Sequence, residues 1–454
     1  MSTGRVTIIG GGLAGSEAAW QCAERRVRVR LFEMRPVRPT AVHRGGSLAE
    51  LVCSNSFKST DPATAHGLLK AEMRRAGSLI LECAERARLP AGAALAVDRE
   101  RFAAEVTAVL ESHPLVEIVR EEVCDIPPGG PTIIAAGPLC SDALAQAVAS
   151  FTGEQNLAFY DAVSPVVDGE TIDWSIAFRG SRYGKGGDDD YVNCPMDREQ
   201  YQRFVAALLA ATEADLHDFD RQLLFEGCLP VEELARRGPD TLRFGPMKPV
   251  GLRDPRTGRR PWAVVQLRQD NFAASHWSMV GFQNRLRWAD QKSVFRMVPG
   301  LETAEFVRLG MVHRNTFINA PAILRETFQS RARADLFFAG QISGVEGYTE
   351  STASGLVAGL GAVALSAGLD PPVFPAETAL GALQRYVAAA DPGTYQPTNI
   401  AFGLLPALDP PVRQKAERKR RLAERALSSI ETYLSRCPLF PGSGRGVAVP
   451  RGGC

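Results

Sequence analysis

The sequence predicts an α/β protein, in which a Rossmann-type nucleotide-binding domain is built from both ends of the chain around an inserted α+β domain. A strand, a glycine turn, a helix and a second strand open the chain. Two more apolar strands, each followed by a glycine turn, lie downstream, and the region between these segments is richer in aromatic and β-forming residues. A chain of 454 residues is too long for one simple core, so two domains are expected.

The first element is a complete βαβ unit for a dinucleotide. Residues 5–9 (RVTII) form a β-branched strand and residues 10–15 (GGGLAG) a glycine turn. A helix over 16–25 and a strand over 27–32 follow. This order of elements around G-x-G-x-x-G favours a bound ligand over a glycine turn without one.

Each glycine of the turn has a mechanical role. Gly10 makes the tight turn, Gly12 lets the backbone approach a pyrophosphate, and Gly15 lets helix and strand pack closely. The helix N-terminus then presents free N–H groups to the phosphates. The other predicted cofactor contacts in this turn are Gly11, Leu13 and Ala14.

Glu33 ends the second strand, where its carboxylate can accept hydrogen bonds from a ribose 2′-hydroxyl. A 2′-phosphate would be repelled, so the site suits FAD or NAD better than NADP.

Two downstream segments favour a flavoprotein over a dehydrogenase. Residues 132–137 (TIIAAG) and 336–341 (LFFAGQ) are apolar strands ending in small-residue turns, and a small-residue helix covers 350–365. Gly340 and Gln341 are therefore predicted to contact the flavin. A packed αβ crossover explains either segment equally well when it is taken alone.

These segments set the predicted domain boundaries. Residues 1–162 and 321–437 form the FAD-binding domain, 163–320 the inserted substrate domain, and 438–454 a disordered Gly- and Pro-rich tail. Within the insertion, the charged glycine-rich stretch 182–190 is predicted to be a mobile surface loop, with a substrate lid as the alternative.

Composition places limits on function. Lys plus Arg (52) balances Asp plus Glu (51), so any nucleic-acid surface must be a local patch. The basic stretch 413–425 is predicted to be a solvated amphipathic helix rather than a phosphate-binding patch.

Nine cysteines without close C-x-x-C pairs favour a reducing compartment and no metal site. The sequence contains neither a signal peptide nor a membrane-spanning stretch, so we expect a cytoplasmic protein that does not bind a membrane.

Two cysteines are candidates for catalysis. Cys53 lies among small polar residues close to Lys58, and Cys228 lies in a Gly- and Pro-bounded turn. Polar neighbours and a nearby cation favour the reactive thiolate. Cys22 and Cys83, by contrast, lie in apolar helical runs typical of structural cysteines.

Several sequence blocks together carry a family resemblance: GGGLAG (10–15), VCSNSF (52–57), YVNCPM (191–196), EGCLP (226–230), GPMKP (245–249), QLRQDN (266–271), VGFQ (280–283), HRNT (313–316) and GQISGVEGY (340–348). With these blocks the chain resembles the folate- and FAD-dependent tRNA (uracil-54-C5)-methyltransferases of the glucose-inhibited-division type. The resemblance runs from the N-terminus to about residue 402. It is loosest at the Gly-Gly-Asp-Asp-Asp loop and in the tail.

The resemblance implies a reaction and its participants. Methylenetetrahydrofolate gives a one-carbon unit, FAD passes it on and reduces it, and NADH or NADPH restores the electrons. The product is 5-methyluridine in the T-loop of tRNA, and no obligate protein partner is expected.

This chemistry requires thiols, because carbon 5 of uracil becomes nucleophilic only after a thiolate adds at carbon 6. A second group must remove the proton at carbon 5. By analogy Cys228 is the nucleophile and Cys53 the assisting acid/base or flavin-side thiol, although these roles could be exchanged.

Other residues are weaker candidates for substrate binding. Arg268 and Asn271 could read a pterin or pyrimidine edge, or else lie at a solvated strand end. His313 could stack on a flat ring or meet folate carboxylates, although a structural histidine is favoured on local grounds. Glu346 and Tyr348 follow the glycine turn near the expected flavin.

Three alternatives remain. A wobble-uridine tRNA-modifying flavoprotein shares the FAD unit but carries a long helical C-terminal extension, for which this chain ends too early. An NADH-dependent disulfide reductase would show two cysteines separated by four residues, which this chain lacks. A non-catalytic tRNA-binding flavoprotein would need a basic patch but not the thiols.

Overall fold

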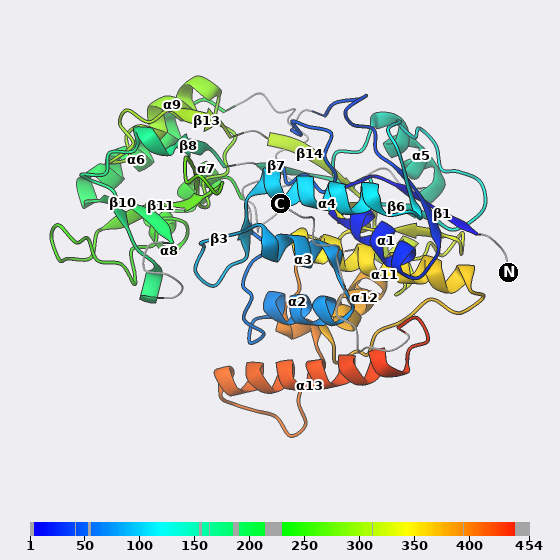
Figure 1. Ribbon diagram of the computed structural model, residues 1–454. Helices are drawn as coiled ribbons and strands as arrows, with labels where there is room; N and C mark the ends of the chain where they lie inside the picture. The colour runs from blue at the N-terminus through cyan, green and yellow to red at the C-terminus, as the bar shows by residue number, and fades with distance from the viewer. Residues whose placement is uncertain are drawn as a thin grey trace.

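The computed structural model describes residues 4–40, 42–52, 56–153, 157–162, 164–184, 190–213, 229–310, 312–393 and 395–440. The larger part of the molecule is built around a five-stranded parallel sheet (Figure 1). Its strands in spatial order are β15 (Leu336–Phe338), β6 (Thr132–Ile134), β1 (Arg5–Ile9), β2 (Arg28–Phe32) and β5 (Val116–Val119). The C-terminal strand therefore joins the N-terminal sheet, which confirms the prediction that both ends of the chain build one domain.

Helices cover this sheet. Helices α1 (Leu13–Glu24) and α11 (Tyr348–Ser366) cross so closely that a Cβ at Gly355 would lie 2.2 Å from the Ala14 carbonyl oxygen. Small residues in α11 thus allow the two ends of the chain to pack together. The other helices of this part are α2 (Ala65–Arg75), α3 (Leu79–Arg86), α4 (Arg99–Ser112), α5 (Asp142–Thr152), α10 (Ala320–Ile323), α12 (Ala379–Ala389) and α13 (Lys415–Arg436).

The inserted region folds around a six-stranded antiparallel sheet, on the left in Figure 1. The spatial order is β13 (Phe306–Arg308), β8 (Val166–Asp168), β12 (His276–Met279), β11 (Ala263–Gln269), β10 (Tyr191–Met196) and β9 (Phe178–Arg179). Its helices are α6 (Arg198–Ala210), α7 (Val231–Arg236), α8 (Thr241–Phe244) and α9 (Trp288–Phe295). Part of the aromatic content of this region lies in its core, where Trp277, Phe204 and Phe282 are buried, whereas Trp174, Tyr183 and Trp288 are exposed.

The molecule has two main hydrophobic cores. The larger contains residues 6–148 and 317–439, and the smaller contains residues 167–304. Between them β7 (Leu157–Ala162) and β14 (Val312–Phe317) pair as an antiparallel ribbon, and β3 (Arg88–Leu89) pairs with β4 (Ala96–Val97). The domain division predicted at residues 163 and 320 remains a prediction that these two cores support.

The C-terminal region packs onto the first domain. Helix α13 buries Leu422, Ala426 and Ile430 and exposes a charged face, on which Arg420 and Arg421 pair with Glu417. This pattern supports the solvated amphipathic helix over a phosphate-binding patch. Leu439 is also buried, so the packed chain extends past residue 438, where the sequence predicted the tail to begin. None of the described helices is both long and apolar enough to cross a membrane.

Candidate active site

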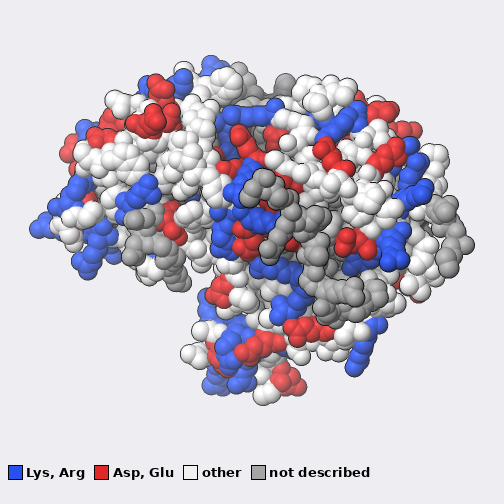
Figure 2. Space-filling model, in the orientation of Figure 1, with Lys and Arg blue, Asp and Glu red and all other residues white. Residues whose placement is uncertain are grey.

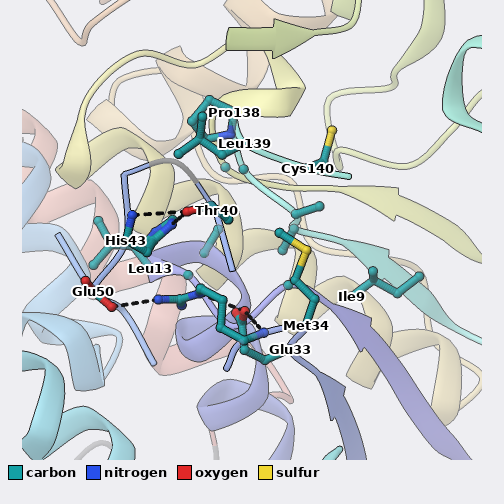
Figure 3. Close-up of a pocket in the computed structure, with 18 of the residues that line it drawn as sticks. Ile9, Leu13, Glu33, Met34, Thr40, His43, Glu50, Pro138, Leu139 and Cys140 are labelled. Carbon is teal, nitrogen blue, oxygen red and sulfur yellow. Dashed lines mark hydrogen bonds and ion pairs between the residues drawn. The ribbon is translucent and has the colours of Figure 1, made fainter. Parts of the chain in front are cut away.

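A cleft lies at the carboxyl ends of β1, β2, β6 and β15, where ligands bind in open parallel sheets. The space between its walls, with the open solvent at its mouth included, is about 1020 Å³. Figure 3 shows part of its wall. The predicted cofactor residues that line it are Gly10, Gly12, Leu13, Ala14, Glu33, Gly340 and Gln341.

The glycine turn has the geometry that the sequence predicted. Gly10 has φ +104°, and a Cβ there would lie 2.4 Å from the Ala135 carbonyl oxygen. A Cβ at Gly15 would lie 1.8 Å from the Gly10 carbonyl oxygen, so only glycine fits where the helix meets the turn. No described atom lies within 4 Å of the position that a Cβ on Gly12 would take, so the backbone there is open to the cleft.

The first turn of α1 suits an anion. Gly12 is its N-cap, and within the described chain no side chain caps this end of the helix. Leu13 and Ala14 line the cleft at this first turn. Uncapped N–H groups and the positive end of the helix dipole together favour phosphate oxygens.

Glu33 is buried in a network of donors at the end of β2. Its carboxylate accepts a hydrogen bond from the Gly11 N–H at 3.0 Å and one from the Arg35 Nε at 2.9 Å. Arg35 also donates to Glu50 at 2.8 Å, and Figure 3 shows Glu33 and Glu50 on the same side of the cleft. Burial raises the pKa of Glu33, but the hydrogen bonds and charge of Arg35 outweigh it and hold the pKa below its ordinary value.

Replacing Glu33 by glutamine is expected to destabilise the protein by about 3 kcal/mol, because Arg35 loses a buried partner. The folded pKa of Glu33 lies below the unfolded value of about 4.3, so the pair stabilises the fold above that pH and is lost as pH falls through the folded pKa. Thermal unfolding from pH 3 to 8 should show a parent–variant difference that shrinks at the acid end.

Glu117→Gln is the matched control, because Glu117 pairs with Arg30 on the surface with half of its side chain exposed. It should change stability far less than Glu33→Gln does, because solvent screens the exposed pair. Equal losses for the two variants would contradict the role given to the buried pair.

Sequence reasoning missed several groups in this wall. Arg35 and Glu50 fix Glu33, and Thr40 Oγ1 lies 2.7 Å from His43 Nδ1 beside them, as Figure 3 shows. The sequence signal for Arg35 was its place two residues after Glu33. Cys140, also in the wall, gave no signal, and burial raises the pKa of its thiol to about 11.

The opposite wall comes from the C-terminal segment. Gln341 donates from Nε2 to Glu346 Oε2 at 2.7 Å, so the predicted residue Glu346 orients a residue that lines the cleft. Tyr348 lines the cleft directly, and its ring centre lies 5.6 Å from that of Phe57. The glycine turn after β15 therefore meets the chain that follows the first cysteine block.

Cys53 and Cys228 both lie outside the described residues, so their placement stays a prediction. The neighbours of Cys53 lie at the cleft, because Val52 lines it and Phe57 packs on Tyr348. Arg308 of β13 donates to the Val52 carbonyl oxygen at 3.4 Å and so links the inserted sheet to this segment.

The blocks around Cys228 pack together in the inserted region. The Val231 N–H donates to the Gln283 carbonyl oxygen at 2.8 Å. Gly281 has φ +75°, and a Cβ there would lie 2.8 Å from Pro246 Cβ. The blocks at 245–249 and 280–283 are thus in contact with each other, and the second also contacts the chain that follows Cys228.

The chain after Cys53 is held by residues that the sequence did not single out. The Phe57 carbonyl oxygen accepts hydrogen bonds from Lys70 Nζ at 2.6 Å and from Thr349 Oγ1 at 3.1 Å. Lys70 is fully buried, and burial lowers the pKa of its amine to about 7. A lysine in the apolar face of a helix gives no sequence signal for this role.

The residues that are weaker candidates for substrate binding lie in different environments. The Asn271 carboxamide bonds Ser275 and the N–H of His276, so it closes the turn between β11 and β12. Arg268 is half-buried and lies opposite Ser278 of β12. His313 lies in β14, paired with Asp161, and its side chain is outside the described atoms. Their substrate contacts stay predictions.

The described cysteines other than Cys140 do not line the cleft. Cys22 and Cys83 are buried in α1 and α3, as predicted, and burial raises the pKa of Cys22 to about 12. All six described cysteines are free thiols. No cluster of His, Cys, Asp or Glu among the described residues is arranged to hold a metal ion.

Known proteins resemble this chain over most of its length. The chain matches the family described as glucose inhibited division protein A over residues 5–370. It is 60% identical to the methylenetetrahydrofolate--tRNA-(uracil-5-)-methyltransferase TrmFO of Symbiobacterium thermophilum over 95% of this chain and 98% of that relative. The protein of that name from Pelotomaculum thermopropionicum is 57% identical over 95% of this chain and 99% of that relative.

A solved structure supports the fold. Aquifex aeolicus GidA in its form I crystal aligns with a TM-score of 0.66 at 16% identity, covering 95% of this chain and 78% of that one. The chain belongs to the glucose inhibited division protein A family, together with the methylenetetrahydrofolate--tRNA-(uracil-5-)-methyltransferases that are its relatives.

Proposed function

We propose that this protein transfers the one-carbon unit of 5,10-methylenetetrahydrofolate to carbon 5 of uridine 54 in tRNA, with FAD as cofactor and NADH or NADPH as reductant. The single observation that carries the proposal is 60% identity, over nearly the full length of both chains, to a relative named for this methyl transfer. The cleft supports it with a wall suited to a dinucleotide.

The residues of the cleft fit FAD. The open backbone at Gly12 and the uncapped first turn of α1 suit a pyrophosphate. Glu33 remains ionised beside Arg35, and its Oε2, which accepts the Gly11 N–H, can accept a further hydrogen bond from a ribose hydroxyl. Tyr348 and Gln341 close the side from which the flavin ring would be contacted. Bound FAD supplies the electrons that reduce the transferred methylene group to a methyl group.

The protein's own groups activate the uracil. The Cys228 thiolate adds to carbon 6, and the electron pair moves to carbon 5, which attacks the methylene carbon while that carbon is still bound to its carrier nitrogen. A base, which we assign as Cys53, then removes the proton from carbon 5, and the bond between the methylene carbon and its carrier nitrogen breaks, leaving an exocyclic methylene group on carbon 5. After reduction, loss of the Cys228 thiolate from carbon 6 restores the aromatic ring and frees the enzyme.

Incubation of purified FAD-loaded protein with methylenetetrahydrofolate, NADH and unmodified tRNA transcript tests the proposal. Nucleoside mass spectrometry should find 5-methyluridine in the transcript and none in a transcript carrying cytidine at position 54. A modification at the wobble uridine would favour the related wobble-modifying activity. Binding of tRNA without any modification would favour a non-catalytic flavoprotein.

A further inference from the structure

Arginines gather on one loop at the outer end of the inserted region. The segment 251–262 links α8 to β11 and carries Arg253, Arg256, Arg259 and Arg260 against a single acid, Asp254. All four arginines are exposed. Figure 2 shows a concentration of blue at the left edge, at the end of the inserted region farthest from α5 in Figure 1.

The loop is held in one shape by its acid. The Asp254 carbonyl oxygen accepts from the N–H of Thr257 and of Gly258, and the Asp254 N–H donates to the Arg259 carbonyl oxygen at 2.9 Å. Its buried carboxylate binds Arg256 through the backbone N–H and the guanidinium. Gly258 takes φ +65°, which closes the turn. The charges are therefore displayed on an ordered turn.

A cleft beside this turn adds two more guanidinium groups. Arg243 lies 3.6 Å from the ring centre of Trp262 and donates from Nε to the Trp262 carbonyl oxygen at 3.0 Å. Arg198, at the first turn of α6, lies 5.3 Å from the same ring centre. Arg260 and Arg256 line the same cleft. The tryptophan thus places guanidinium groups next to those of the loop.

Most of this positive charge is uncompensated. Within the described chain no ion pair forms with Arg198, Arg253, Arg259 or Arg260, whereas Arg256 is paired with Asp254 and Arg243 with Asp240. Three acids line the cleft as well: Asp254 is paired with Arg256, whereas Asp197 and Glu302 accept backbone N–H groups from Gln200 and Gly300 and keep their negative charge, so the surplus of positive charge lies on the loop. Four guanidinium groups with free donors therefore face solvent together.

We propose that this arginine surface, formed by Arg198, Arg253, Arg259 and Arg260, binds the sugar–phosphate backbone of the tRNA substrate. The planar fork of guanidinium donors matches phosphate oxygens, and closely spaced forks suit a polyanion with regularly spaced charges. The whole chain carries a net charge of only +1, so a nucleic-acid contact has to come from a local surface such as this. The inference rests on the proposed function for its choice of RNA.

The test replaces Arg253, Arg259 and Arg260 together by glutamine in the full-length FAD-loaded protein. The dissociation constant for unmodified tRNA transcript is measured by fluorescence anisotropy from 50 to 200 mM KCl. Removing three phosphate contacts should weaken binding about ten-fold or more at low salt and flatten the slope of log K against log salt by about 2 to 3. In the methylation assay, KM for tRNA should rise by a similar factor while kcat stays within about two-fold.

A triple variant of α13, Lys415→Gln with Arg418→Gln and Lys419→Gln, removes the same charge from another surface and should bind as the parent does. Charge reversal by Arg259→Glu with Arg260→Glu should weaken binding further than neutralisation does. Unchanged affinity and salt slope in the loop variants, or equal losses in the α13 variant, would overturn the proposal. A parent that binds tRNA through this loop but makes no 5-methyluridine would instead overturn the proposed function alone.

Discussion

Cys228→Ala is expected to lower 5-methyluridine formation by on the order of 10³-fold or more, because carbon 5 of uracil gains nucleophilic character only when a thiolate adds at carbon 6. Binding of tRNA and of FAD should be unchanged, since alanine removes only the sulfur. Single-turnover assays with mass spectrometry of the nucleosides measure the loss. Cys124→Ala is the matched control, because Cys124 is an exposed free thiol outside the cleft, and it should retain full activity.

A transcript with 5-fluorouridine at position 54 separates the roles of the two thiols. Fluorine cannot leave carbon 5 as the proton does, so a covalent protein–RNA adduct should accumulate whenever the nucleophile is present. Cys53→Ala should form the adduct and Cys228→Ala should not. Formation of the adduct by Cys228→Ala but not by Cys53→Ala would exchange the two assignments.

Gly15→Ala is expected to lower the free energy of unfolding by about 3 kcal/mol or more. The variant should also lose the bound cofactor. The new Cβ would lie 1.8 Å from the Gly10 carbonyl oxygen, so the helix α1 has to shift away from the turn. Thermal unfolding and the flavin absorbance of the purified protein measure both effects.

Gly12→Ala is the companion variant, since no described atom lies within 4 Å of its new Cβ and its φ of −71° suits alanine. This protein should unfold at the parent temperature when free of cofactor, yet retain much less FAD, because the methyl group enters the space needed by the pyrophosphate. A Gly12→Ala protein with normal flavin content would place the cofactor elsewhere.

The parallel sheet could be predicted from the sequence because three of its strands are short apolar runs followed closely by glycine turns. β1, β6 and β15 all follow this pattern and lie side by side. The contact between α1 and α11 was not predicted. It depends on Gly355 and Gly359, whose spacing in a helix of small residues is equally consistent with many packing partners.

The candidate site was predicted only where a residue's role depends on its local sequence. Gly10, Gly12, Gly15 and Glu33 belong to one continuous unit, and the structure places the unit as expected. Arg35 with Glu50, and Lys70 with Phe57, are pairs that only the folded chain brings together. Asn271, by contrast, belongs to a polar run that the sequence singled out for substrate binding. In the structure its side chain hydrogen-bonds to Ser275 within the same turn.

The most direct test of the proposed function follows the transferred carbon. Methylenetetrahydrofolate with both methylene hydrogens replaced by deuterium is given to the FAD-loaded protein with unlabelled NADH and tRNA transcript in ordinary water. If the folate methylene becomes the methyl group after gaining one hydrogen on reduction, 5-methyluridine will be two mass units heavier than the unlabelled product. Product of unshifted mass would show that the carbon comes from another donor and would contradict the proposed reaction.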